Sequence, residues 1–120
     1  MSGHFCSVGG GIHPSAYIGG NPESREWVPE DGTDGVELGE GVRVEAFVTV
    51  DAALKGFDGP TRIGARSWLF RHVHAGHNVQ IGEDCEIATG SGIGGHVVIG
   101  DRVKVGLGAI FRPFVKVGDG

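Results

Sequence analysis

Four of the six histidines in this 120-residue chain lie close together in the sequence, at His72, His74, His77 and His96. A neutral imidazole titrates at about pH 6.5 and is therefore a good general base at neutral pH. Three imidazoles that converge can instead hold Zn²⁺ and leave a fourth position open for water. A solvent-exposed histidine needs neither explanation, so the chemistry depends on whether the fold brings these side chains together.

The histidines lie within a stretch that repeats every six residues, from Ile63 to Gly120. A period of six matches neither the 3.6-residue turn of a helix nor the two-residue alternation of an ordinary strand. It is typical of a parallel β-helix built from hexapeptide repeats, in which each hexad forms a short strand and a turn. Apolar or small residues fill the first repeat position: Ile63, Leu69, Ala75, Ile81, Ile87, Ile93, Ile99, Val105, Phe111 and Val117.

We expect two rows of side chains to point into this β-helix. The second row follows four positions after the first and comprises Ser67, Val73, Val79, Cys85, Ser91, Val97, Val103, Ala109 and Val115. Three hexads complete one triangular coil, so residues 18 apart should stack. Each coil should pair its backbone with its neighbours at about 4.8 Å. We expect the glycines that follow the first row to accept corner backbone angles that other residues resist.

The predicted fold class is all-β, a single domain over residues 1–120 with no C-terminal helical domain. Residues 1–11 form a glycine-rich lead-in that we expect to be flexible. Two segments break the period and should leave the β-helix as loops. Residues 20–35 contain two prolines and five acidic residues, and residues 52–60 contain two glycines and a proline. From residue 63 to residue 120 the repeat is uninterrupted.

Composition excludes several classes of function. The net charge of −5 and the pI near 5.6 leave no basic surface for nucleic acid. No apolar run approaches the ~20 residues of a membrane span. The N-terminus lacks the features of a signal peptide, so we expect a cytoplasmic protein. The two cysteines do not suggest a disulfide framework, because Cys85 falls in an inward row of the repeat.

The repeat predicts where the histidines point. His72, His74 and His77 occupy the fourth, sixth and third hexad positions, and none of these is an inward position. His96 follows His77 by 19 residues, which is almost one coil. We therefore expect the four side chains to project outward near corners and to form a small cluster on one edge.

Three tracts around these histidines resemble the UDP-N-acetylglucosamine acyltransferase family, whose members catalyse the first step of lipid A synthesis. They are Leu69-Phe-Arg-His-Val-His-Ala-Gly-His-Asn78, Cys85-Glu-Ile-Ala and Gly94-Gly-His-Val97. The resemblance extends to the segments Ile18–Trp27 and Phe47–Val50 and covers about residues 12 to 120. It implies a left-handed parallel β-helix that assembles as a homotrimer, with active sites between neighbouring subunits.

The resemblance also implies roles for individual residues. His77 would be the general base that removes a proton from a hydroxyl of a sugar or sugar-nucleotide acceptor. That hydroxyl would attack the thioester of an acyl carrier protein or of coenzyme A, without any other cofactor. The backbone N–H of Gly95 would stabilise the oxyanion, a contribution often worth ~3 kcal/mol. His74 and His96 would line the acceptor or thioester pocket.

The sequence departs from the family at several substrate-binding positions. Asn78 stands where the family has an acidic residue after the base. Ser24 and Glu26 replace the aspartate and lysine that bind the sugar nucleotide, and Arg112 falls where the family has a histidine. Asn78, Ser24 and Arg112 remain candidate substrate-binding residues. These departures argue against the family's own lipid A precursor as the acceptor.

Two other hypotheses belong to different functional classes. A γ-class carbonic anhydrase shares the predicted fold and uses two histidines five residues apart as metal ligands, the spacing of His72 and His77. Its third ligand would fall near Asp51, and the adjacent motifs fit the acyltransferase better. The acyltransferase hypothesis assigns no metal ligand. The last possibility is a catalytically lapsed β-helix that serves as a structural trimer.

Overall fold

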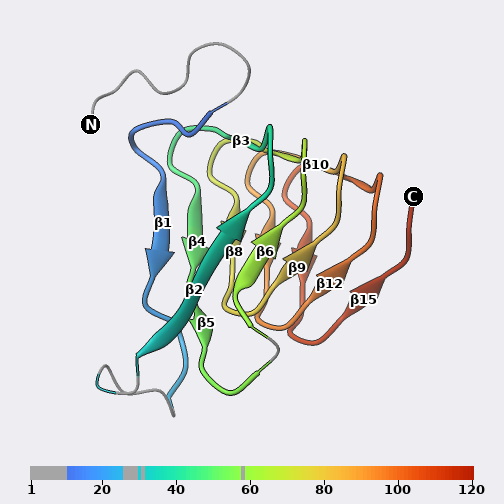
Figure 1. Ribbon diagram of the computed structural model, residues 1–120. Helices are drawn as coiled ribbons and strands as arrows, with labels where there is room; N and C mark the ends of the chain where they lie inside the picture. The colour runs from blue at the N-terminus through green and yellow to red at the C-terminus, as the bar shows by residue number, and fades with distance from the viewer. Residues whose placement is uncertain (1–10, 26–29, 31, 58) are drawn as a thin grey trace.

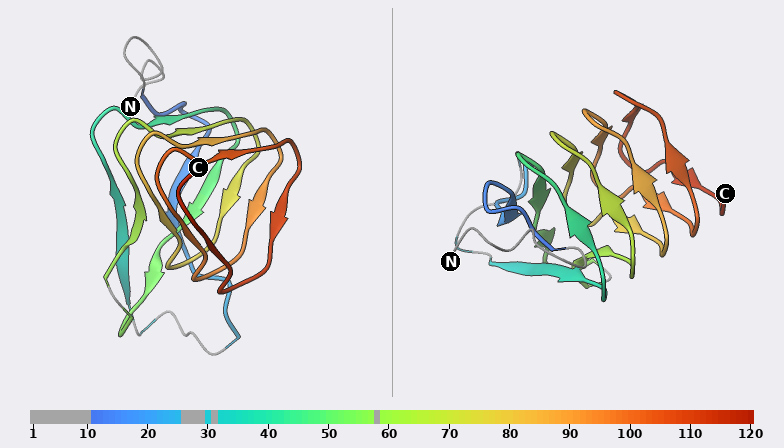
Figure 2. Two further views of the ribbon diagram at one scale, coloured as in Figure 1. Left: turned by 90° about the vertical axis from the view of Figure 1, so that its right-hand side faces the viewer. Right: turned by 90° about the horizontal axis from the view of Figure 1, so that it is seen from above.

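The computed structural model describes residues 11–25, 30, 32–57 and 59–120. The chain winds into a triangular prism whose coils stack along one axis (Figure 1), and its three walls are three sheets (Figure 2). Within the described residues, no helix has the length and apolar character of a membrane span. The predicted lead-in, residues 1–11, lies outside the described residues except for Gly11.

Each wall contains short strands from successive coils. The first sheet consists, in order, of β1 (Tyr17–Gly20), β4 (Thr49–Asp51), β8 (His74–Ala75), β11 (Gly92–Ile93) and β14 (Ile110–Phe111). The second consists of β13 (Lys104–Val105), β10 (Glu86–Ile87), β7 (Trp68–Leu69) and β3 (Arg43–Val44). The third consists of β15 (Lys116–Val117), β12 (Val98–Ile99), β9 (Gln80–Ile81), β6 (Thr61–Ile63), β2 (Thr33–Leu38) and β5 (Ala53–Leu54).

The 18-residue stacking predicted from the repeat is confirmed. Ile63 pairs with Ile81, Ile81 with Ile99, and Ile99 with Val117, all in parallel register. The two predicted inward rows form most of the core, which is buried from Val42 to Val105 and partly buried at Phe111 and Val117. Val115, which the repeat predicts to point inward, is instead 38% exposed in the last coil. Full burial of one such aliphatic side chain contributes about 1.5–3 kcal/mol, so the core stabilises the prism along its length.

Two inward positions hold serine, and both hydroxyls are satisfied. Ser67 Oγ donates to the carbonyl of Gly82 at 2.7 Å, and Ser91 Oγ donates to the carbonyl of Gly106 at 3.0 Å. A buried hydroxyl without such a partner would destabilise the fold. These hydrogen bonds link each coil to the next and let a small polar residue occupy a core position.

The predicted role of the glycines after each strand is wrong. The left-handed backbone angle falls two residues later. It is adopted there by Arg66 with φ 62° and Asp84 with φ 57°, and in two other turns by Gly90 and Gly108. Glycine is needed instead because the coils approach closely at the position after the strand. A Cβ on Gly64 would lie 2.5 Å from the carbonyl carbon of Gly82, and one on Gly82 would lie 2.6 Å from that of Gly100.

The two predicted loops are shorter than their predicted ranges, because each contains part of a strand. β2 begins at Thr33, inside residues 20–35, and β5 lies inside residues 52–60. β2 and β5 pair antiparallel, whereas all other strand pairs in the described residues are parallel. Both segments leave the prism between its first and third sheets, so they meet there and satisfy each other's backbone groups.

Candidate active site

One corner of the prism gathers the chemistry-bearing residues. We call it the His77 corner and define it as the set of turns that connect the first sheet to the third. The turn from β8 to β9 carries His77, the turn from β11 to β12 carries Gly95 and His96, and the turn from β14 to β15 carries Phe114. The two loops depart from this same corner in the earlier coils, so they flank the later turns.

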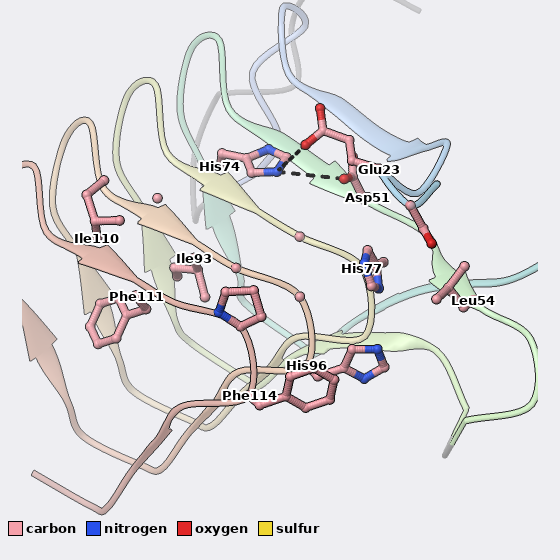
Figure 3. Close-up of a pocket in the computed structure, with 16 residues that line it drawn as sticks. Glu23, Asp51, Leu54, His74, His77, Ile93, His96, Ile110, Phe111 and Phe114 are labelled. Atoms are coloured by element: carbon pink, nitrogen blue, oxygen red, sulfur yellow. Dashed lines mark ion pairs between the residues drawn. The ribbon is translucent and has the colours of Figure 1, made fainter. Parts of the chain in front are cut away.

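A pocket of about 580 Å³ opens at the His77 corner (Figure 3). One end is polar and is formed by Glu23, Asp51 and His74. The other end is apolar and includes Ile93, Ile110, Phe111, Pro113 and Phe114. His77 and Gly95 line the pocket with them, so a polar reactant and an apolar one can both reach His77.

Hydrogen bonds around Asn78 set the tautomer of His77. The Leu54 N–H donates to Asn78 Oδ1 at 2.9 Å, and His77 Nδ1 lies 3.2 Å from the same oxygen. Because Oδ1 can only accept, His77 Nδ1 carries the hydrogen and Nε2 keeps its lone pair. Asn78 is itself held by its buried N–H, which donates to Thr61 Oγ1 at 2.8 Å. The arrangement gives His77 the protonation form that a general base requires.

Gly95 lies against His77 and has an unused backbone donor. Within the described residues the Gly95 N–H donates no hydrogen bond. At the neighbouring corner, Glu83 holds the same repeat position as Gly95. Its N–H donates to Asp101 Oδ1 in the next coil at 2.8 Å. The residue one coil beyond Gly95 is Pro113, which offers no side-chain oxygen. The N–H of Gly95 is therefore available for a ligand oxygen.

His96 lies in an aromatic stack at the edge of the pocket. Its ring stacks on Phe114 with centroids 4.6 Å apart and an interplanar angle of 2°, and it meets Phe57 edge-on at 5.0 Å. It also meets the ring of His77 edge-on at 5.0 Å. Burial, aided by the charge of His77, lowers the pKa of His96 from its ordinary 6.5. The stack therefore favours a neutral His96 beside His77.

His74 joins two carboxylates at the polar end of the pocket. Its Nδ1 lies 2.7 Å from Thr49 Oγ1, and its Nε2 lies 3.7 Å from both Asp51 Oδ2 and Glu23 Oε1. Burial raises the pKa of Asp51 above its ordinary 3.8, and the charge of His74 opposes this effect.

The repeat does not predict Asp51 or Glu23 as site residues, although Asp51 carries a signal in the sequence. Val50 pairs with Ala75, so Asp51 lies beside Gly76 and occupies a place that the repeat usually fills with glycine. Glu23 lies in the first loop, where no period exists to place it.

The structure brings together most of the predicted site residues. His77, Gly95, His74, His96 and Ser24 line the pocket, and Asn78 contacts it through His77. Arg112 is exposed and does not line the pocket. Glu26 lies outside the described residues.

The predicted cluster of four histidines contains only three, because His72 lies at a different corner. It sits in the turn from β7 to β8, before the strand, whereas His77 sits after it. The ring of His72 stacks on Phe47 with centroids 5.1 Å apart. Within one chain, the two histidines of the carbonic anhydrase hypothesis are therefore not brought together.

Comparisons with known proteins agree with the fold. Residues 60–95 match the family model described as bacterial transferase hexapeptide (six repeats). The chain is 32% identical over 104 residues to an acyl-[acyl-carrier-protein]–UDP-N-acetylglucosamine O-acyltransferase of Campylobacter concisus, covering 87% of this chain and 39% of the relative. The corresponding protein of Alkalilimnicola ehrlichii is 29% identical over 103 residues, covering 86% of this chain and 39% of the relative.

Two solved structures are also similar. A perosamine N-acetyltransferase variant from Caulobacter crescentus, in complex with CoA and GDP-perosamine, superposes with a TM-score of 0.70 at 27% identity, covering 94% of this chain and 44% of that one. A UDP-N-acetylglucosamine O-acyltransferase from Moraxella catarrhalis superposes with a TM-score of 0.56 at 26% identity, covering 90% and 44%.

The chain is therefore an all-β protein with a left-handed parallel β-helix built from hexapeptide repeats. Its sequence is homologous to the UDP-N-acetylglucosamine O-acyltransferases. It spans about two fifths of the length of these relatives, at 39%.

Proposed function

We propose that this protein transfers an acyl group from a thioester to a nucleotide-linked sugar, with His77 as the general base. The observation that carries the proposal is the close packing of the His77 ring against Gly95. It places a lone pair on an imidazole nitrogen beside an unused backbone N–H. General-base catalysis and oxyanion stabilisation are the two contributions that acyl transfer to a hydroxyl needs.

The proposed reaction uses His77 twice. The acceptor hydroxyl gives its proton to His77 Nε2 as its oxygen attacks the thioester carbonyl carbon. The tetrahedral oxyanion accepts a hydrogen bond from the Gly95 N–H. The carbon–sulfur bond then breaks, and the departing thiolate takes the proton from the imidazolium. No covalent intermediate forms on the protein, and the proton balance closes within one turnover.

Asn78 orients His77 but, as an amide, carries no charge to stabilise an imidazolium. The case for His77 as the base therefore rests on geometry, namely its hydrogen bond with Asn78 and its contact with Gly95.

The two ends of the pocket suit two reactants. The apolar end, with Phe111 and Phe114, fits the acyl chain and the arm of an acyl carrier protein or coenzyme A. The polar end, with His74 and Ser24, fits the sugar. Relatives act on UDP-N-acetylglucosamine, and the similar acetyltransferase was solved with GDP-perosamine. The proposed acceptor is accordingly a sugar linked to a nucleoside diphosphate.

We further propose that the protein is a homotrimer whose subunits complete the pocket. The pocket rim leaves Ile110 and Phe114 exposed at 74% and 68%. Exposed apolar side chains grouped at a pocket are typical of surfaces that contact another protein. Sedimentation at micromolar concentration should give a trimer, and a stable monomer would remove the composite site.

Replacement of His77 tests the base assignment. His77→Ala should lower the rate of thiol release from acetyl-CoA or acyl carrier protein by about 100-fold or more, in the presence of nucleotide sugars. The circular dichroism spectrum should stay unchanged, because His77 lies outside the core. His72→Ala is the matched control and should retain activity, since His72 does not line the pocket. Equal rates in wild type and His77→Ala would exclude His77 as the base.

A further inference from the structure

Asp51 has a buried carboxylate oxygen without a partner. Its side chain is only 9% exposed. Within the described residues, Oδ2 is buried and accepts no hydrogen bond. Burying a carboxylate oxygen without a compensating interaction destabilises a protein, and such atoms are rare. Oδ2 points toward His74 at the polar end of the pocket (Figure 3). A cation or a hydrogen-bond donor would satisfy this atom.

The ring of His74 cannot satisfy Asp51 by a hydrogen bond. Its Nε2 lies 3.7 Å from Asp51 Oδ2 and 3.7 Å from Glu23 Oε1. Both distances are too long for a hydrogen bond. On the other side of the ring, Nδ1 lies 2.7 Å from Thr49 Oγ1. When Nδ1 donates to this hydroxyl, Nε2 turns a lone pair toward two carboxylates. A histidine that ligates a metal is usually held in this way through its other nitrogen.

We propose that Glu23, Asp51 and His74 bind a divalent transition-metal ion. One donor atom from each residue lies within 4.8 Å of the other two. Ligands at about 2.1 Å from a shared ion stand ~3.4 Å apart in a tetrahedral site. The Glu23 side chain is 79% exposed and can close the remaining gap. One imidazole and two carboxylates form a donor set that suits Zn²⁺ and similar ions.

Three protein ligands leave one coordination position open toward the pocket. The bound ion neutralises the two carboxylates and gives Asp51 Oδ2 the partner that it lacks. In combination with the proposed function, on which this consequence rests, the open position would hold an oxygen of the acceptor. The polar end would then lose its net negative charge and present a metal ion to a diphosphate oxygen, at a place where neither Ser24 nor Glu23 offers a cation.

Metal binding can be measured without any catalytic assay. The full chain, stripped with a chelator, should bind one Zn²⁺ per chain in calorimetry and unfold at a higher temperature when Zn²⁺ is added. Co²⁺ should give a visible absorption band that reports its coordination by nitrogen and oxygen. Asp51→Asn and His74→Gln should each weaken Zn²⁺ binding by at least about tenfold. Circular dichroism should confirm that both variants remain folded.

Two control variants separate this site from adventitious binding. His72→Gln and Glu86→Gln remove an exposed imidazole and an exposed carboxylate elsewhere, and both should bind Zn²⁺ like wild type. Absence of binding, or equal binding by wild type and Asp51→Asn, would overturn the proposal. One ion bound through Asp51 in a protein without acyl transfer would support this inference and overturn the proposed function. Acyl transfer by a protein that binds no metal would support the proposed function and overturn this inference.

Discussion

The imidazole of His77 packs directly against Gly95, which lies one coil further along the prism. A Cβ on residue 95 would stand 2.7 Å from Cε1 and 2.8 Å from Nε2 of this ring. Real Cβ atoms do not approach other atoms so closely, so only glycine at this position allows the ring to lie where it does. The residue that offers the proposed oxyanion donor therefore also determines where the ring of His77, the proposed base, can lie.

Gly95→Ala should displace the His77 ring and lower kcat/KM for thioester-dependent transfer by about 100-fold, because a misplacement of ~1 Å costs about that much. The KM for the acyl donor should change less than kcat. Gly106→Ala is the matched control, since nothing lies within 4 Å of a Cβ on Gly106. Equal activity in both variants would show that the ring contact does not position the base.

Asn78→Asp should change the pH dependence of the reaction. The aspartate can accept the same hydrogen bond from Leu54 N–H, but its charge favours the protonated form of His77. The acid limb of the kcat/KM profile should therefore move upward by about 1 pH unit or more. Because residue 78 is only 6% exposed, burial of the new carboxylate should also destabilise the fold, which urea unfolding would detect. An unchanged acid limb would contradict the assignment of His77.

Gly82→Ala should destabilise the prism without touching the pocket. A Cβ on Gly82 would lie 2.6 Å from the carbonyl carbon of Gly100, so two coils would have to separate. Overpacking of this kind costs about 1–3 kcal/mol. The free energy of unfolding in urea should fall by this amount in Gly82→Ala and by much less in Gly118→Ala, which meets nothing within 4 Å. A smaller loss in Gly82→Ala would contradict the close-approach role of glycine.

His96 should make stability depend on pH below about 6.5. Its pKa is lowered in the folded protein, first by burial and then by the charge of His77. As the pH falls through the ordinary pKa of 6.5, His96 becomes protonated in the unfolded chain but stays neutral in the folded chain, so the free energy of unfolding decreases. Above the ordinary value this contribution vanishes.

Unfolding in urea at pH 7.5 and pH 5.5 would measure this effect. Wild type should lose more stability between these two pH values than His96→Gln, and an NMR titration of the His96 ring should show the lowered pKa directly. His96→Gln also loses the ring stacking, but this loss lowers its stability equally at both pH values. It therefore cancels when the change in stability between the two pH values is compared with that of wild type. An equal loss in both proteins would show that His96 titrates alike in the folded and unfolded chains.

The six-residue period predicts the core well because every coil obeys it. Rows such as Ile63, Ile81 and Ile99 must face inward in any coil with three sides, and the strand register follows from the spacing. The period does not explain why glycine follows most of the strands from β6 onward. That requirement comes from the distance between coils, which a list of hexad positions does not contain.

The site was only partly predictable for a related reason. His77, Gly95 and His96 fall on regular turns, and their sequence tract resembles that of a known family. His72 is only two residues from His74, but it lies in the turn before β8 and His74 lies on β8. Their side chains therefore separate, with His72 against Phe47 and His74 in the pocket. Glu23 comes from a segment outside the repeat, where only the folded chain shows what it meets.

The regular coils of the prism cannot change in length, whereas the two loops that carry the antiparallel pair β2 and β5 can. A residue inserted within residues 63–117 would shift every later inward row out of alignment. The two loops depart from the prism and return to it, so they can absorb changes in length, and they carry Glu23 and Leu54 to the pocket. Evolution can therefore alter what the polar end of the pocket accepts by editing two short segments, while the frame that carries His77 and Gly95 is inherited intact.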